Sequence, residues 1–174
     1  DGTHDWRISL DWTNHFLGAF LGYVHVVKIL IQNGVDVNAV NEEKKTALHF
    51  AAWRGHVDVA KVLIQNGADV NAIDENKYTA LHFAARTGHV DVAKVLIQNG
   101  AEVNAVQWNN WAALHLASAG ENIDILKVLI QNGADVTAVI LDDRTSLCIA
   151  AQRGKVACTL QLLCFGAEID NKAL

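Results

Sequence analysis

Three histidines recur at one position of a repeated pattern, since His49, His82 and His115 are spaced 33 residues apart. Histidine is a common metal ligand and general base, and three of them could bind zinc if they met Cys, Asp or Glu. Each ends a "TALH" or "AALH" tetrapeptide. A residue that recurs once per repeat occupies its own layer of a stacked array, so these side chains should not converge. The spacing therefore predicts structural histidines.

Other chemistry is not indicated by the sequence. It contains no HExxH, GxSxG, Walker or CxxC motif. The three cysteines, Cys148, Cys158 and Cys164, form an odd, clustered set that does not suit a disulfide framework. We expect small core or partly exposed thiols in a reducing, cytoplasmic compartment. The sequence predicts no enzyme activity, no cofactor and no metal site.

Composition excludes some partners. The chain has 174 residues, 51% of them hydrophobic, and a net charge of −5. Such a chain has no general electrostatic attraction to nucleic-acid phosphates. No apolar run approaches the roughly 20 residues that span a bilayer, and no signal peptide is visible. We expect a monomer that binds neither nucleic acid nor membrane.

The start at Asp1 and the absence of Met suggest a processed or trimmed product, or a fragment of a longer protein.

A period of 33 residues organises the chain. The segment "KVLIQNGADVNA" returns almost unchanged, and a period of 20–50 residues indicates a solenoid. Within one period, Thr46 suits a helix N-cap before "ALHFAAWR", Gly55 breaks that helix, and "HVDVAKVLIQN" follows as a second one. Gly67 suits the left-handed residue that ends it. Because helices this short do not persist alone, the pattern predicts stacked helix pairs.

The repeated motifs resemble the ankyrin repeat family. "TALH", "AALH" and "TSLC" are similar to its T-P-L-H motif, although Ala or Ser replaces the Pro, and "GHVDVAKVLIQNGADVNA" is similar to its second helix and hairpin. The resemblance implies an all-α solenoid with β-hairpin loops, in which the motif histidine holds the inter-repeat turn by hydrogen bonds. After a flank at 1–7, it divides the chain into an irregular first unit and four more, the last resembling a cap: 8–40, 41–73, 74–106, 107–139 and 140–172.

The second and third units differ drastically at only four positions: Glu43/Asn76, Lys45/Tyr78, Trp53/Arg86 and Arg54/Thr87. In an ankyrin stack these positions are the hairpin tip and the outer end of the first helix, which line a concave groove. Changes that concentrate on one surface indicate a surface under its own selection. The fourth unit also differs at 116–125, which we interpret as drift away from the groove.

Aromatic residues gather at the same positions, which hold four of the five tryptophans. Trp, Tyr and Arg dominate binding hot spots. We therefore predict a non-catalytic scaffold that binds a partner protein through the concave groove.

Two origins of the chain stay open, an engineered binder or a natural segment. The alternative function is a targeting or adaptor module of a larger protein, such as a host-interacting effector or an enzyme whose catalytic domain lies elsewhere. The candidate binding residues are Trp12, Glu43, Lys45, Trp53, Arg54, Asn76, Tyr78, Arg86, Trp108, Trp111 and Arg144.

The resemblance also implies a modification. "DVNA" and "EVNA" are similar to the hairpin asparagine sites that an oxygen-dependent asparaginyl hydroxylase modifies in ankyrin proteins. Asn38, Asn71 and Asn104 are the candidate sites, and Thr137 breaks the pattern in the fourth unit.

Overall fold

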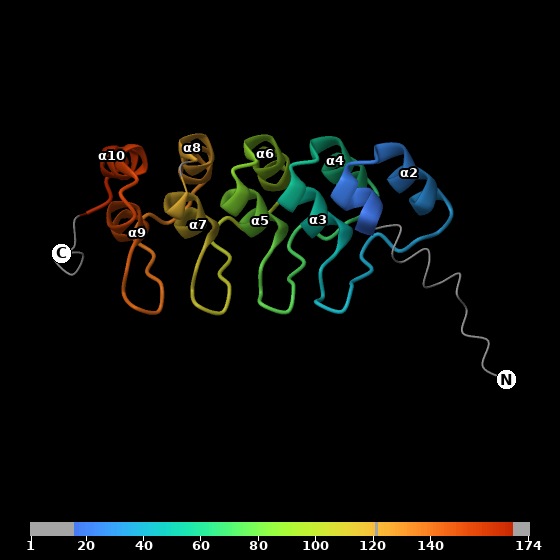
Figure 1. The fold of residues 1–174 in the computed structure, drawn as a ribbon, viewed down its shortest axis with the longest axis horizontal. Helices are drawn as coiled ribbons and strands as arrows, with labels where there is room; N and C mark the ends of the chain where they lie inside the picture. The colour runs from blue at the N-terminus through green and yellow to red at the C-terminus, as the bar shows by residue number, and fades with distance from the viewer. Residues whose placement is uncertain (1–15, 121, 169–174) are drawn as a thin grey trace.

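The computed structural model describes residues 16–120 and 122–168 and consists of helix pairs in a row (Figure 1). Residues 16–21 are helical and precede α2, Val24–Gln32. Four further pairs follow: α3 Ala47–Arg54 with α4 Val57–Gln65, α5 Ala80–Thr87 with α6 Val90–Gln98, α7 Ala113–Ala119 with α8 Ile123–Gln131, and α9 Ser146–Gln152 with α10 Val156–Cys164.

The helix ends follow from local sequence. α3 begins directly after Thr46, which has an extended backbone with ψ of 169°. It ends at Arg54 and is followed by Gly55, whose φ of 78° lies in the left-handed region that favours glycine. An ideal Cβ on Gly55 would also lie 2.5 Å from the ring of His89, which belongs to the next repeat. Glycine is therefore required here both by the turn and by the close approach of a neighbour.

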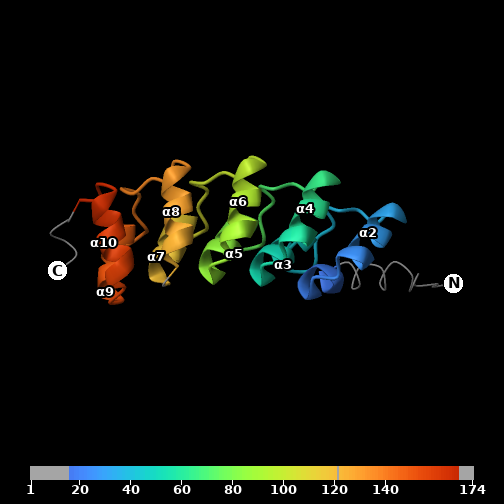
Figure 2. The ribbon, with the colours of Figure 1, turned by 90° about the horizontal axis from the view of Figure 1, so that it is seen from above.

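The helices form two layers (Figures 1 and 2). The first helices α3, α5, α7 and α9 pack successively in one layer, and the second helices α2, α4, α6, α8 and α10 pack in the other. Each first helix also packs on the second helix of its own repeat. Leu48, Leu81 and Leu114, at one repeat position, are each 1% exposed and lie in the continuous core. Burial between layers stabilises helices that are too short to persist alone.

Loops project from the row of helices as fingers (Figure 1). We call residues 41–45, 74–78, 107–111 and 140–144 the fingertips. Each contains one non-glycine residue with φ between 58° and 63°, and these residues are Lys44, Lys77, Asn110 and Asp143. Strand pairing in the described residues is limited to two isolated antiparallel bridges, Val106 with Ala112 and Val139 with Thr145. The expected hairpins are therefore turns with minimal ladder.

No helix within residues 16–120 and 122–168 is both long enough and apolar enough to cross a membrane.

Local stability should be highest in the middle of the row. α4 buries four residues, whereas α2 buries only Val27 and α10 only Cys158 and Leu162. Because each repeat is stabilised by its neighbours, amide hydrogens of α4 and α6 should exchange about tenfold or more slowly than those of α2 and α10. Hydrogen exchange followed by mass spectrometry measures this order, and α2 as the best-protected helix would contradict it.

Candidate functional site

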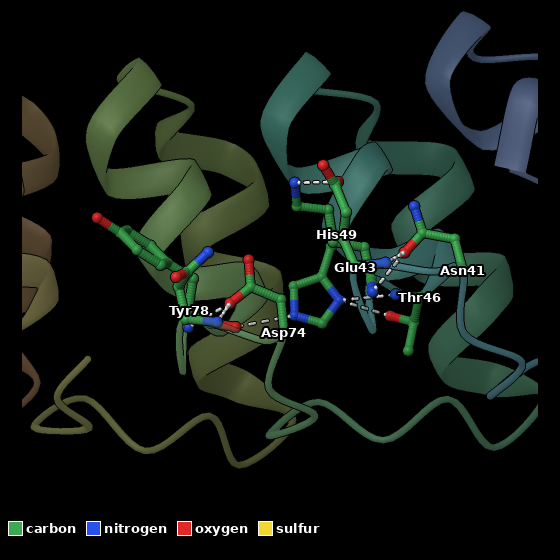
Figure 3. A network of polar contacts seen from close by, with 8 residues as sticks. Asn41, Glu43, Thr46, His49, Asp74 and Tyr78 are labelled. Atoms are coloured by element: carbon green, nitrogen blue, oxygen red, sulfur yellow. Dashed lines mark hydrogen bonds and ion pairs between the residues drawn. The ribbon is translucent and has the colours of Figure 1, made fainter. Parts of the chain in front are cut away.

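A histidine bridge ties each of two first helices, α3 and α5, to the finger of the next repeat, and Figure 3 shows the bridge that His49 makes. His49 Nδ1 accepts the backbone N–H of Thr46 at 3.0 Å and lies 2.8 Å from the Thr46 hydroxyl. Because Nδ1 accepts that hydrogen bond, the ring proton lies on Nε2, which donates to the carbonyl oxygen of Tyr78 at 3.0 Å. The helix of one repeat thereby fixes the fingertip of the next.

The bridge to a fingertip recurs in the next repeat, where His82 Nε2 donates to the carbonyl of Trp111 at 3.1 Å. His115 Nε2 instead donates to the carbonyl of Ala138 at 3.0 Å, before the fourth fingertip and within its own unit. Burial lowers the pKa of His82 to about 4 and lowers the pKa values of His49 and His115 as well, so the three rings are neutral at pH 7. Each histidine binds a different carbonyl group, and the three rings do not share a ligand site. Among the described residues, no group of three His, Cys, Asp or Glu side chains could hold a metal ion.

Each of the first three fingertips is also organised by its first side chain. Asp74, which is buried, accepts the backbone N–H groups of Asn76 at 2.9 Å and Tyr78 at 2.8 Å through Oδ1. Asn41 does the same for Glu43 and Lys45. Gln107 Oε1 accepts one such bond, from Asn109 at 2.8 Å. These residues were not among the predicted site residues, although a side-chain acceptor at this position in successive repeats was a visible signal.

The fingertips and the outer ends of the first helices, residues 53–54, 86–87, 119–120 and 152–153, form the finger face. It contains two hollows of about 360 and 460 Å³, which share Tyr78, Arg86, Gln107 and Asn109 and are therefore adjacent. The first hollow adds Lys45, Asp74, Asn76, Phe83 and Trp108. The second, which we call the central hollow, adds Trp111, Leu116, Ala119, Gly120 and Arg153.

Six predicted binding residues line these two hollows: Lys45, Asn76, Tyr78, Arg86, Trp108 and Trp111. Their exposure differs. Tyr78 and Trp111 are half-buried, and the Tyr78 ring packs 5.5 Å from that of Phe83. Trp108 is 61% exposed. Packing within the chain therefore does not account for the Trp108 side chain.

The other predicted residues lie outside the hollows. Trp53 and Arg54 are exposed at the end of α3, where both contact Phe20: the two aromatic rings are 5.7 Å apart, and the guanidinium lies 4.7 Å from the Phe20 ring centre. Glu43 forms an ion pair with Lys45 at 2.6 Å. Arg144 pairs with Asp142 and donates to Gln152 Oε1 at 2.8 Å. Trp12 lies outside the described residues.

The interpretation of residues 116–125 as drift away from the groove is wrong for Leu116, Ala119 and Gly120, because all three line the central hollow. Ala119 occupies the repeat position of Trp53 and Arg86, so a small side chain stands where the other repeats have large ones. Arg153 was also missed. It occupies the repeat position of Arg54, which was the available signal.

The repeat motifs, the two helical layers and the fingers agree with comparison to known families. The model of ankyrin repeats in three copies matches residues 15–107, 66–140 and 105–173. The chain belongs to the ankyrin repeat family. A search of curated protein sequences returns no match to it. Ankyrin repeats generally mediate protein–protein interactions, and the family is typically non-catalytic.

The hairpin asparagines have one shared role in this ankyrin stack. Asn71 Nδ2 donates to the carbonyl of Gly100 at 3.0 Å, while its Oδ1 accepts the N–H of Glu102 at 2.8 Å. Asn38 and Asn104 make the same pair of bonds to their following repeats. Both amide atoms thus join adjacent repeats. Hydroxylation of these residues stays a prediction, which intact-mass measurement after incubation with an asparaginyl hydroxylase would test.

Acid should weaken the stack through the histidine bridges. The pKa of His82 falls from 6.5 to about 4 on folding, so below pH 6.5 the unfolded chain binds a proton that the folded chain excludes. The stabilisation is complete above pH 6.5 and is lost as the pH falls toward 4. For His82 alone the loss is about 3 kcal/mol of unfolding free energy. Chemical denaturation at several pH values measures it.

The control separates titration from simple destabilisation. The variant His82→Gln should be less stable at pH 7.5 and should show a smaller decline between pH 6.5 and 4. The variant Leu81→Ala removes a neighbouring core side chain and should cost about 2–5 kcal/mol while keeping the parental decline. A parental decline in His82→Gln would show that His82 is not the titrating group.

Proposed function

We propose that this ankyrin chain is a non-catalytic scaffold that binds a partner protein through the finger face. The observation that carries the proposal is the exposed Trp108 in the lining of the first of two adjacent hollows. A tryptophan that is 61% exposed adds apolar surface without packing in the fold. Such aromatic side chains, surrounded by polar groups, are typical of binding hot spots.

The difference between the repeated residues, which stabilise the stack, and the varied residues, which lie on the finger face, supports the same function. Repeated residues account for the fold, because His49 and His82 make equivalent bridges, and the three hairpin asparagines make equivalent pairs of bonds between adjacent repeats. The four drastically varied positions lie on the finger face, and their side chains make no equivalent bonds from repeat to repeat. Variation there changes the surface while the stack is retained.

Charges on the finger face suit a protein partner. Lys45 and Glu43 form one ion pair and Arg144 and Asp142 another, so both signs of charge are present. A nucleic-acid surface needs a basic stripe, and the chain has a net charge of −5. We therefore propose a protein rather than a polyanion as the partner.

Three forms of the chain test which face binds. The intact protein, a finger-face variant carrying Trp108→Ala and Arg86→Ala, and a control carrying Lys28→Gln and Lys61→Gln are immobilised and exposed to the same protein mixture. Lys28 and Lys61 are exposed on α2 and α4, in the other layer. A partner retained by the intact chain and the control but lost from the finger-face variant supports the proposal. Equal retention by all three would overturn it.

Trp108→Ala should separate binding from folding. Because the side chain is 61% exposed, its truncation should change the unfolding free energy by less than about 0.5 kcal/mol. As a hot spot, it should cost about 2 kcal/mol of binding, roughly a thirtyfold rise in Kd. The measurements are a denaturation midpoint and a titration with the captured partner.

Val156→Ala is the matched control, since Val156 is 68% exposed on α10 at the far end of the second layer. It should change neither the stability nor the Kd. If Trp108→Ala lowered the denaturation midpoint while its folded fraction bound normally, Trp108 would be a structural residue.

A further inference from the structure

The central hollow has a local charge opposite to that of the whole chain. Arg86 and Arg153 both line it, and none of its described lining residues is Asp or Glu. We propose, on the basis of the protein-binding function above, that this hollow binds an aspartate or glutamate side chain of the partner protein. The two guanidinium groups would clamp that carboxylate from either side of α7.

The shape of the hollow comes from missing side chains in the fourth repeat. α7 ends at Ala119, one residue earlier than α3 and α5 end in their repeats, and Gly120 follows with an extended backbone. Ala119 stands at the repeat position of Arg86, and Gly120 at that of Arg153. Because α7 lies between α5 and α9, the arginines of the two flanking repeats border a space into which the end of α7, Ala119 and Gly120, brings no large side chain.

The two arginines differ from Lys45 and Arg144, which are paired cations of the finger face. Lys45 is paired with Glu43, and Arg144 is paired with Asp142. No ion pair among the described residues involves Arg86 or Arg153, and both side chains are exposed. A guanidinium presents several N–H donors in a plane and binds a carboxylate in bidentate fashion. Two guanidinium groups in one hollow therefore favour an anionic side chain over a neutral one.

The walls of the hollow strengthen this preference. Trp111 and Leu116 are apolar and partly buried, and they cover part of the space next to the arginines. An ion pair beside apolar walls is less screened by water than one on an open surface. Tyr78 and Asn109 add neutral hydrogen-bonding groups to the same lining. These features select one acidic residue in a protein segment that also buries apolar surface, rather than a highly charged polymer.

A library of random twelve-residue peptides displayed on phage tests the proposal. Peptides selected on the intact chain should share an Asp or Glu, and its replacement by Asn or Gln should raise the Kd about tenfold or more. The double variant Arg86→Gln with Arg153→Gln should show a similar loss for the acidic peptide. The acidic-to-neutral replacement should then have little further effect in that variant, because both changes remove one interaction.

A charge-matched control is the double variant Lys28→Gln with Lys61→Gln, which changes the net charge equally in the other layer and should keep the parental Kd. Full additivity of the peptide and arginine changes, or selected peptides without a shared acidic residue, would overturn the inference. So would displacement of the peptide by inorganic phosphate or by single-stranded DNA in an Arg86- and Arg153-dependent manner, because the hollow would then be a general anion site.

Trp108→Ala distinguishes the two levels of failure. If it weakens peptide binding while the arginine variant does not, the finger face binds protein but the acidic preference is wrong. If neither variant weakens binding, the peptides bind elsewhere and the proposed function fails with it.

Discussion

The hydrogen bond from a buried histidine to the fingertip of the next repeat is the contact on which the surface depends. A finger is a loop with almost no strand pairing, so its own backbone does not fix its position. His49 supplies the missing constraint by holding the carbonyl of Tyr78, and His82 does the same for Trp111. The bridge requires a neutral ring with the proton on Nε2, which burial and the Thr N–H to Nδ1 bond both enforce. Tyr78 and Trp111 are thus held through their backbones while their side chains remain available to line the hollows.

In this arrangement, the residues that stabilise the stack are different from the residues that vary on its surface. The bridge uses the carbonyl of the fingertip residue, and every residue type has one, so Tyr78 and Trp111 occupy equivalent positions and both accept the bond. Core leucines and hairpin asparagines carry further inter-repeat contacts. The surface can therefore change strongly at a few positions while the energetics of the stack, summed over neighbouring repeats, stay nearly constant.

Most of the fold could be predicted from the sequence because its signals are local and repeated. Thr46 before α3, Gly55 after it and the apolar spacing in α4 determine the helix pair, and the period determines the stacking. The site was only partly predictable. Comparison of the second and third repeats found Arg86 and Tyr78, but the central hollow depends on α7, where small residues leave a space between neighbours. Small residues such as Ala119 and Gly120 form no sequence motif that would predict a hollow. Their effect is visible only in the structure, where Arg86 and Arg153 line the same hollow.

The fourth repeat shows how such a hollow can form without loss of the stack. Asn122 replaces the histidine found at His56 and His89, yet it still lies against the preceding repeat, since an ideal Cβ on Gly88 would be 2.5 Å from its side chain. Ile125, Leu126 and Leu129 of α8 are fully buried, and Leu114 of α7 keeps its place in the core. The apolar contacts of the second layer and of the core are therefore retained, and the missing side chains are confined to the end of α7 on the finger face. Because that end faces solvent rather than core, removing its side chains costs little stability, whereas an equal deletion at Leu114 would leave a buried cavity.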